Sequence, residues 1–565
     1  MAPTTSPFRL CVVAAVAALC VDGTLAGVAK APESSCRRTT VAILGGGMAG
    51  IAAAQALHNA SVTDFVIVEY QNRIGGRAID SQFGRRPDGS PYTIELGANW
   101  RRFLAYEATN GQIQGLGNPG GPENPIWSLA DLDRFCPAAP KAKKHKLANT
   151  PSNYSSILTY DETGASDYGH LLEAYEAAAR NMTVEAGRLL AENLQDQSAR
   201  SGLSLAGWNP RHDDMAAQAV EYWSWDWETT VPPEVSSMIF GAAGNNLTFR
   251  QFSEDNNLVV DARGYRAIIE GEAATFLTAN DTRLRLNGRV TSISHDEAGV
   301  VVRSDDGSCL SAAYALCTFS LGVLQHGDVE FAPALPTWKQ RAVHKFSMGT
   351  YTKIFFQFDE TFWPTDKEYF LYASPTTRGY WAQWQSLSTD GFLPGSNILF
   401  ATVTGDESYR LEQLSDDEAK LEGLAVLRQM FPDRTVPEPT AFTYPRWTKT
   451  AWSRGSYSNW PVGTTLEMHQ NLRANVGRLW FAGEATSAAY FGFLHGAWFE
   501  GREAGEQIAG LLRDGCGRSA EAAGERRCGA RVHYETLHGT SPLASYNVLN
   551  GWATSSFYAS KASAQ

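Results

Sequence analysis

The most regular hydrophobic pattern lies near the start of the chain, where an apolar run, spaced glycines and an alanine-rich stretch follow one another. Residues 41–44 are apolar and partly β-branched, which predicts a buried parallel strand. Gly45, Gly47 and Gly50 then have G-x-G-x-x-G spacing, and residues 51–57 favour a helix. Glycines at this spacing permit a tight turn, close backbone approach to a pyrophosphate, and close packing of helix on strand. The pattern predicts a helix N-terminus that faces phosphate groups.

A second strand and an acidic residue extend this unit. Residues 65–68 are apolar and lead into Glu69, which lies 19 residues after Gly50, where a ribose-binding carboxylate is expected. The alternative is a glycine-rich turn followed by a surface glutamate. The two strands, the spaced glycines, the helix and the acidic residue occur together. Their combination favours a dinucleotide-binding unit that spans residues 38 to about 80.

Later hydrophobic patterns predict a mixture of helices and strands. An amphipathic helix is expected over 168–194, and strands over 283–293, 299–303 and 348–358. In the last strand, period-two alternation places Tyr351, Lys353 and Phe355 on one face. A lysine in so apolar a strand suggests a functional role for Lys353. The alternative is that Lys353 lies at an edge of the sheet and extends its ammonium to solvent.

Length, charge and the N-terminal segment narrow the class of protein. The 565 residues are too many for one ordinary domain, and the formal net charge of −12 argues against a nucleic-acid partner and suits a cationic ligand. Arg9, the apolar run 10–20 and small residues after it predict a secretory signal peptide over residues 1–26. This run is too short to span a bilayer, and we expect no membrane segment elsewhere.

Sequons and cysteines fit an extracellular, N-glycosylated protein. The five N-x-S/T sites are Asn59, Asn153, Asn181, Asn246 and Asn280. The cysteines left after signal removal are Cys36, Cys136, Cys309, Cys317, Cys516 and Cys528. Six cysteines allow 15 pairings, of which Cys516 with Cys528 is the preferred local one. Because none has metal-ligand spacing with histidines, we expect no metal site.

Several stretches resemble the flavin-containing amine oxidase superfamily, most closely its secreted plant and fungal polyamine oxidases. They are Arg73-Ile74-Gly75-Gly76-Arg77, Ile94-Glu95-Leu96-Gly97-Ala98-Asn99-Trp100, Tyr351-Thr352-Lys353-Ile354-Phe355, Gly455 to Gly463, and Leu479 to Ala497. The resemblance covers about residues 38 to 515. It implies an α/β plus α+β fold, with a discontinuous, Rossmann-like FAD-binding domain of p-hydroxybenzoate-hydroxylase type and an α+β substrate-binding domain. The implied segments are FAD-binding 38–133, 245–335 and 455–515, substrate-binding 134–244 and 336–454, and a loosely ordered C-terminal tail 516–565.

The resemblance also implies site residues. Those for FAD are Gly45, Gly47, Met48, Ala49, Gly50, Glu69, Arg77, Gly97, Ala98, Asn99, Trp100, Val290, Glu484, Gly492, Phe493 and Leu494. Those for substrate are Gln114, Glu221, Asp226, Glu228 and Tyr351, and the catalytic ones are Lys353, Tyr457 and Phe493. Lys353 would hold a water at the flavin N5, and Tyr457 and Phe493 match an aromatic pair beside the amine. The last motif contains no cysteine for a covalent flavin link, so FAD is expected to bind noncovalently.

One stretch departs from the family pattern. Twelve residues, Arg101 to Gln112, separate Trp100 from the glycine loop that contains Gln114. They are either a genuine insertion or a gene-model error such as retained intron sequence. Polyamine oxidases carry Glu or His at the position of Gln114, and because glutamine cannot act as a base, the amine must be bound differently there.

The implied activity is oxidation of secondary amines of spermidine, spermine or their acetylated forms with O2, which gives an aminoaldehyde, an amine and H2O2. Residues 218–228 are rich in aromatic and acidic side chains, which suit a polycation, although buried core tryptophans beside a solvated acidic face explain them equally well. One rival is an L-amino-acid oxidase or other amine oxidase, of which the former needs an arginine for the substrate carboxylate. Another is an amine-binding flavoprotein without turnover. The cleaved C–N bond and the oligomeric state stay open.

Overall fold

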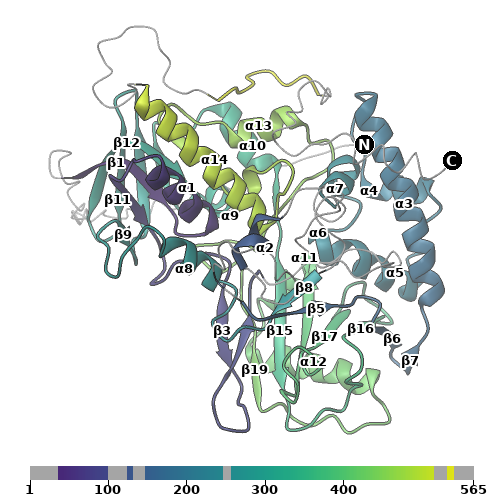
Figure 1. Cartoon of the computed structure of the whole chain (residues 1–565). Helices are drawn as coiled ribbons and strands as arrows, with labels where there is room; N and C mark the ends of the chain where they lie inside the picture. Colours follow the sequence, from purple (N-terminus) through teal and green to yellow (C-terminus); the bar gives the residue numbers. More distant parts are fainter. Residues whose placement is uncertain are drawn as a thin grey trace, which may run out of the picture.

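The computed structural model describes residues 36–98, 124–130, 145, 147–245, 256–514 and 531–539. Two large β-sheets organise this part of the chain, with helices packed against them (Figure 1). One sheet has eight strands and the other has seven.

The eight-stranded sheet contains the predicted dinucleotide unit. Its order is β13 (Glu330–Ala332), β10 (Val290–His295), β11 (Val300–Ser304), β12 (Cys309–Cys317), β1 (Arg37–Leu44), β2 (Phe65–Val68) and β9 (Leu284–Arg285), with β21 (Leu479–Phe481) paired to β12. Strand β1 runs parallel to β2 and β12, so that Leu44 lies beside both Val68 and Cys317. Because these strands come from three distant stretches of sequence, their carboxyl ends bring distant loops together at one edge.

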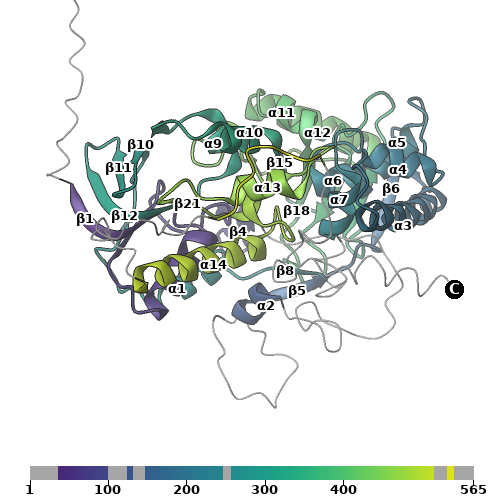
Figure 2. The ribbon, with the colours of Figure 1, turned by 90° about the horizontal axis from the view of Figure 1, so that it is seen from above.

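Two helices pack tightly beside this sheet. Helix α1 (Met48–Asn59) follows β1, and α14 (Leu494–Arg513) lies alongside it in both ribbon views (Figures 1 and 2). A Cβ atom on Gly501 would come within 2.1 Å of the Ala49 carbonyl oxygen, so only glycine allows this approach. The remaining helices of this part are α2 (Pro125–Ala130), α8 (Ala267–Ala273), α9 (Leu321–His326), α10 (Thr337–Lys345) and α13 (Leu466–Arg473).

The seven-stranded sheet carries the lysine-containing strand. Its order is β19 (Ala441–Thr443), β15 (Tyr351–Gln357), β18 (Ile398–Thr404), β17 (Gln383–Ser386), β16 (Tyr369–Tyr372), β6 (Ile157–Asp161) and β7 (Gly164–Ser166). Its helices are α3 (Gly169–Ala191), α4 (Ala199–Leu205), α5 (Met215–Glu221), α6 (Trp227–Thr229), α7 (Met238–Asn245), α11 (Gly405–Leu411) and α12 (Asp416–Met430). The group α3 to α7 lies at the opposite end of the molecule from β1 and β11 in both views (Figures 1 and 2).

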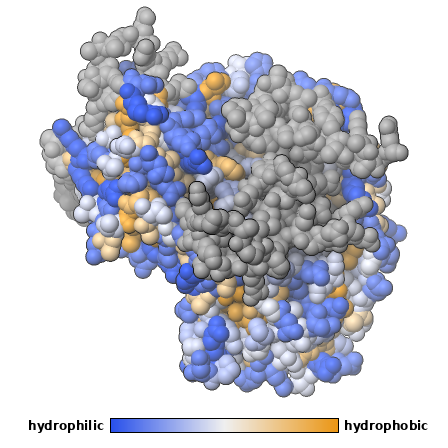
Figure 3. Space-filling model, viewed as in Figure 1, coloured by the Kyte–Doolittle hydropathy of each residue, from blue (hydrophilic) through white to orange (hydrophobic). Residues whose placement is uncertain are grey.

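Short strands complete the described structure. They pair as β3 (Asp80–Phe83) with β4 (Tyr92–Glu95), β5 (Asn149–Ser152) with β8 (Asn256–Val259), and β14 (Ser347–Met348) with β20 (Ser458–Asn459). The predicted elements at 41–44, 51–57, 65–68 and 168–194 are confirmed as β1, α1, β2 and α3. Within the described residues, no helix is both long and apolar enough to cross a membrane. On the face seen in Figure 3, hydrophilic side chains cover most of the coloured surface, with smaller apolar areas between them.

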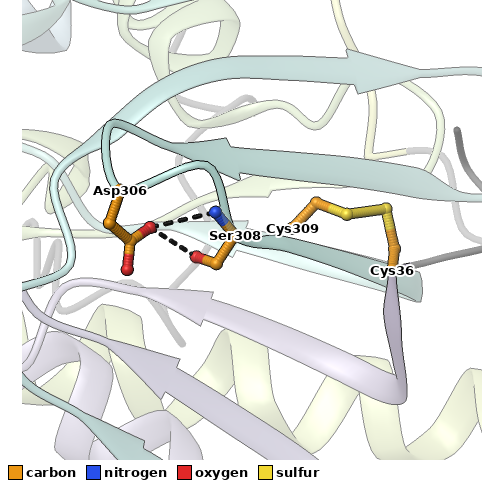
Figure 4. Close-up of a disulfide and its surroundings, with 4 residues drawn as sticks. All are labelled: Cys36, Asp306, Ser308 and Cys309. Carbon is orange, nitrogen blue, oxygen red and sulfur yellow. Dashed lines mark hydrogen bonds between the residues drawn. A yellow bond between two sulfur atoms is a disulfide. The ribbon is translucent and has the colours of Figure 1, made fainter. Parts of the chain in front are cut away.

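A disulfide joins the starts of two neighbouring strands of the eight-stranded sheet. Cys36 precedes β1 and Cys309 begins β12, and the bond closes a separation of 273 residues (Figure 4). The turn before Cys309 is held by Asp306, whose carboxylate accepts hydrogen bonds from the Ser308 amide and hydroxyl (Figure 4). The preferred Cys516–Cys528 pair lies outside the described residues, and Cys317 is a buried free thiol.

Part of the C-terminal segment packs on the fold, which corrects the expectation of a loosely ordered tail for residues 531–539. The Arg531 side chain is buried, and its guanidinium lies over the Trp480 ring at 4.9 Å. Asn471 of α13 donates to the Tyr534 carbonyl at 2.8 Å and accepts from the Tyr534 amide at 2.7 Å. Composition failed here because a few specific contacts, rather than a hydrophobic run, hold this segment.

Candidate active site

A cavity of about 380 Å³ is lined by residues from both sheets and from the N-termini of α1 and α14. It brings together most of the predicted site residues. Those in its lining are Gly45, Gly47, Met48, Ala49, Glu69, Arg77, Gly97, Ala98, Glu228, Val290, Tyr351, Lys353, Tyr457, Glu484, Gly492, Phe493 and Leu494. The site residues Asn99, Trp100 and Gln114, and the stretch Arg101 to Gln112, lie outside the described residues.

The glycine turn has the geometry that a dinucleotide needs. Gly45 has a φ of +119°, a conformation that favours glycine, and its amide donates to the Val68 carbonyl at 2.8 Å. Gly50 does not line the cavity; a Cβ atom there would come within 1.9 Å of the Gly45 carbonyl oxygen, so this glycine lets the helix pack on the turn. At the end of β2, the buried Glu69 carboxylate accepts from the Gly46 amide at 2.6 Å.

The cavity fits FAD at two helix N-termini. Neither Gly47, the N-cap of α1, nor Phe493, the N-cap of α14, makes a side-chain capping bond. The backbone at both helix N-termini, Gly47 to Ala49 of α1 and Phe493 to His495 of α14, lines the cavity, so the positive ends of both helix dipoles face it. A Cβ atom on Gly47 would be in van der Waals contact with the Gly76 Cα at 3.8 Å, so the two glycine turns lie against each other, and both line the cavity. Such a cradle suits an extended anionic cofactor.

A buried carboxylate links three distant segments beside this cradle. Glu484 accepts from the Arg77 guanidinium at 2.8 Å, from the Ser458 hydroxyl at 2.6 Å and from the Gly492 amide at 2.8 Å. Arg77 also donates to the Ser456 carbonyl at 2.8 Å. Because charge-assisted hydrogen bonds of this kind are strong, the Glu484 carboxylate holds Arg77 and the backbone at Gly492 in place beside the cavity.

Lys353 reaches the cavity from β15 and is almost fully buried, with 3% of its surface exposed. Its ammonium donates to the carbonyls of Glu95 at 3.1 Å and Gly97 at 2.7 Å. Burial lowers the pKa of Lys353, and the nearby Glu95 carboxylate partly opposes that shift; burial likewise raises the pKa of Glu95. The side chain is thus placed to hold or exchange a proton at Nζ.

Aromatic rings form the wall of the cavity near Lys353. Trp227, Tyr351 and Tyr457 line it, with ring centroids 6.4 Å apart for the first pair and 6.0 Å for the second. The Tyr457 hydroxyl donates to the Glu228 carbonyl at 2.8 Å, which ties the segment before β20 to α6. Trp227 belongs to the aromatic and acidic stretch 218–228, for which the sequence left a cation-binding role and a core role open. Sequence reasoning missed Trp447 as a lining residue, since a single tryptophan in a sequence looks like any core residue.

Two predicted substrate carboxylates lie elsewhere, because arginine side chains bind them. Glu221 and Asp226 are buried and absent from the described lining. Arg378 donates to Asp226 at 2.7 Å and to Glu221 at 3.0 Å. Glu221 also bonds Arg200 and accepts from the Trp208 indole at 2.9 Å. Of the three predicted acids, the structure therefore brings only Glu228 to the cavity.

Comparison with known proteins places this geometry in a family. The family model for flavin-containing amine oxidoreductases matches residues 48–509. Polyamine oxidase 7 of Oryza sativa subsp. japonica is 35% identical over 484 residues, which cover 82% of this chain and 93% of that protein. Polyamine oxidase 1 of Zea mays is 36% identical over 488 residues, which cover 82% and 89%.

Solved structures share the fold at low sequence identity. A putrescine oxidase superposes with a TM-score of 0.63 at 17% identity, covering 84% of this chain and 100% of that one. Cyclohexylamine oxidase from Brevibacterium oxydans IH-35A gives a TM-score of 0.62 at 19% identity, covering 84% and 99%. These likenesses confirm the predicted fold class.

Proposed function

Because the chain belongs to the flavin-containing amine oxidoreductase family, we propose that it is an FAD-dependent polyamine oxidase. The reaction is the oxidation of a secondary amine, R–CH2–NH–R′, with O2 and water to an aldehyde R–CHO, a primary amine R′–NH2 and H2O2. When bound, FAD would supply the redox chemistry, which is acceptance of a hydride (two electrons and one proton) from the α-carbon and transfer of the two electrons to O2. The rest of the chemistry is binding, orientation and proton placement by the protein.

The observation that carries this proposal is the charge of the cavity near Lys353. Its wall there consists of aromatic rings and the acidic Glu228, which suit an extended cation. Among the described lining residues, the arginines are Arg77, which pairs with Glu484, and Arg289, which is adjacent to Val290 in the chain. An L-amino-acid oxidase needs an arginine for the substrate carboxylate, and neither lining arginine belongs to the aromatic wall formed by Trp227, Tyr351 and Tyr457.

The residues divide into two roles. The glycine turns, Glu69, Arg77 and Glu484 would hold FAD, and the described lining contains no cysteine, which supports noncovalent binding. Tyr351 and Tyr457 would orient the amine between aromatic surfaces and keep water away. Lys353 would hold a water or a proton at Nζ next to the reacting groups. Its lowered pKa supports this role because a neutral amine can accept a proton near neutral pH.

We also propose that the protein is secreted and N-glycosylated. The Cys36–Cys309 disulfide supports an oxidising compartment. The sequon side chains Asn59, Asn153, Asn181 and Asn280 are exposed on the described surface. Expression in a secretory host, with glycosidase treatment of the medium fraction, tests this: protein confined to the cells and unchanged in mass would contradict it.

The function is tested by H2O2 release from the purified flavoprotein. The substrates are spermidine, spermine and their acetyl derivatives, with putrescine, a monoamine and L-amino acids for comparison. We expect peroxide from at least one compound with a secondary amine and far less from the L-amino acids. Activity restricted to L-amino acids supports the rival oxidase, and reduction of the flavin by none of the compounds supports the binding protein.

A further inference from the structure

A π-helical turn, Tyr222–Asp226, interrupts the helix that leads to the cavity. It lies between α5 and α6, directly before the cavity residues Trp227 and Glu228. π-Helical turns are rare in proteins and occur often at functional sites. The turn shifts every later side chain around the helix axis, so the presentation of Trp227 and Glu228 depends on it.

One arginine from another segment spans this turn. Arg378 lies in the loop between β16 and β17, and its guanidinium bonds both Glu221, before the turn, and Asp226, its last residue. In an α-helix, residues five apart point about 140° from each other, whereas the wider turn of a π-helix, with its i to i+5 hydrogen bonds, brings them closer to the same side. A single guanidinium that binds both carboxylates therefore favours the π-helical form.

The loop that carries Arg378 is fitted against the same turn. Gly379 has a φ of +79°, and a Cβ atom there would come within 2.6 Å of the Tyr222 ring. The Tyr222 hydroxyl accepts from the Thr404 amide at 2.8 Å. At the far end, Trp227 stacks on Trp223 with ring centroids 4.9 Å apart and planes 6° apart. The turn is thus held at its start, along its length and at its exit.

We propose that Arg378 is a positioning residue for substrate recognition: by bridging Glu221 and Asp226 it holds the π-helical turn that sets Trp227 and Glu228 against the cavity. This inference rests on the proposed polyamine oxidase function. Glu228 and the Trp227 ring bind a substrate ammonium other than the amine that is oxidised, so Arg378 affects the binding of polyamines with more than one charged nitrogen. Arg378 itself is not among the described lining residues, so its loss affects the chemical step little.

The test compares Arg378→Met with a matched control, Arg410→Met. Arg410 also bridges two carboxylates, Glu407 and Glu422, and none of these three lines the cavity. Steady-state peroxide release from spermidine is measured per bound flavin. We expect KM to rise at least tenfold and kcat to change less than threefold in Arg378→Met, and KM to stay within twofold in Arg410→Met.

A second variant keeps the test decisive if Arg378→Met does not fold. Arg378→Lys retains the positive charge, but the compact lysine ammonium cannot bridge both carboxylates as the guanidinium does. We therefore expect a KM rise of at least threefold with normal flavin content. Spermidine KM within twofold of wild type in the folded Arg378 variants would overturn the inference. Absence of peroxide from every polyamine in the wild type would instead overturn the proposed function.

Discussion

Two lysines are buried in different regions of the molecule, and we compare their surroundings to tell a structural role from a catalytic one. Lys339 lies in α10 with none of its surface exposed, and its ammonium donates to the carbonyls of Asn471, Leu472 and Ala474 at the end of α13. It also lies 3.7 Å from the centre of the Phe481 ring. Lys353 donates to two carbonyls of another segment, but it lines the cavity. Burial lowers the pKa of both amines.

The difference shows that burial and a shifted pKa do not by themselves mark a catalytic lysine. The three carbonyls around Lys339 are C-terminal groups that α13 leaves without helical partners, so this lysine completes a helix end. Lys353 occupies a comparable backbone niche, but it lies where a substrate and a flavin would meet. We therefore expect substitution of the two lysines to affect different properties.

The largest expected effect is on turnover in Lys353→Met. Methionine keeps much of the length and the apolar stem but cannot hold a proton or a water. We expect turnover with spermidine, per bound flavin, to fall about 10³-fold, a barrier increase of about 4 kcal/mol. Peroxide release and the melting temperature are measured together. A large loss of melting temperature with normal turnover in the folded fraction would make Lys353 structural.

The next effect is on stability in Lys339→Met. This change leaves the α13 carbonyls without their donor in a buried site. We expect the free energy of unfolding to fall by about 3 kcal/mol, because each buried unsatisfied acceptor costs about 1–3 kcal/mol and the site relaxes in part. Differential scanning calorimetry measures it. Turnover per bound flavin should stay within twofold of wild type; a deeper loss of turnover would remove the contrast between the two lysines.

The two lysines also differ in how clearly the sequence marks them. Lys353 stood out because its neighbours in the chain are apolar, whereas Lys339 lies in the polar helix Thr337–Lys345, where a lysine is ordinary. The cofactor side of the cavity was predictable because its glycine turns and acids are contiguous motifs. The substrate side of the cavity was harder to predict, because hydrogen bonds between distant residues shape it. The bond from Tyr457 to Glu228 joins residues 229 apart, and the bond from Arg378 to Asp226 joins residues 152 apart. Such pairs leave no periodic signal.

The smallest expected effect concerns pH, in the helix that Lys339 caps. His469 of α13 is buried, and burial lowers its pKa to about 3. Between pH 6.5 and 3 the unfolded chain binds a proton that the folded protein excludes, so this residue makes stability fall as the pH falls. From pH 6.5 to 5 the loss is about 2 kcal/mol.

His469→Gln removes this titration but retains a donor for the Ala485 carbonyl, which His469 Nε2 approaches at 3.0 Å. We expect the free energy of unfolding of the variant to fall by about 2 kcal/mol less than that of wild type over the same pH interval. Thermal unfolding in matched buffers at pH 6.5 and pH 5 measures the difference. Equal acid losses in the two proteins would show that His469 is charged in the folded state.

The most direct test of the division between the two lysines is stopped-flow absorbance of the flavin. Reduction by saturating spermidine without oxygen, and reoxidation by O2, are measured in wild type, Lys353→Met and Lys339→Met. We expect Lys353→Met to slow at least one of the two steps by about 10³-fold and Lys339→Met to leave both within twofold. If both rate constants of Lys353→Met stay within about twofold of wild type, a barrier change under ~0.4 kcal/mol, then Lys353 is not catalytic and the assignment is wrong.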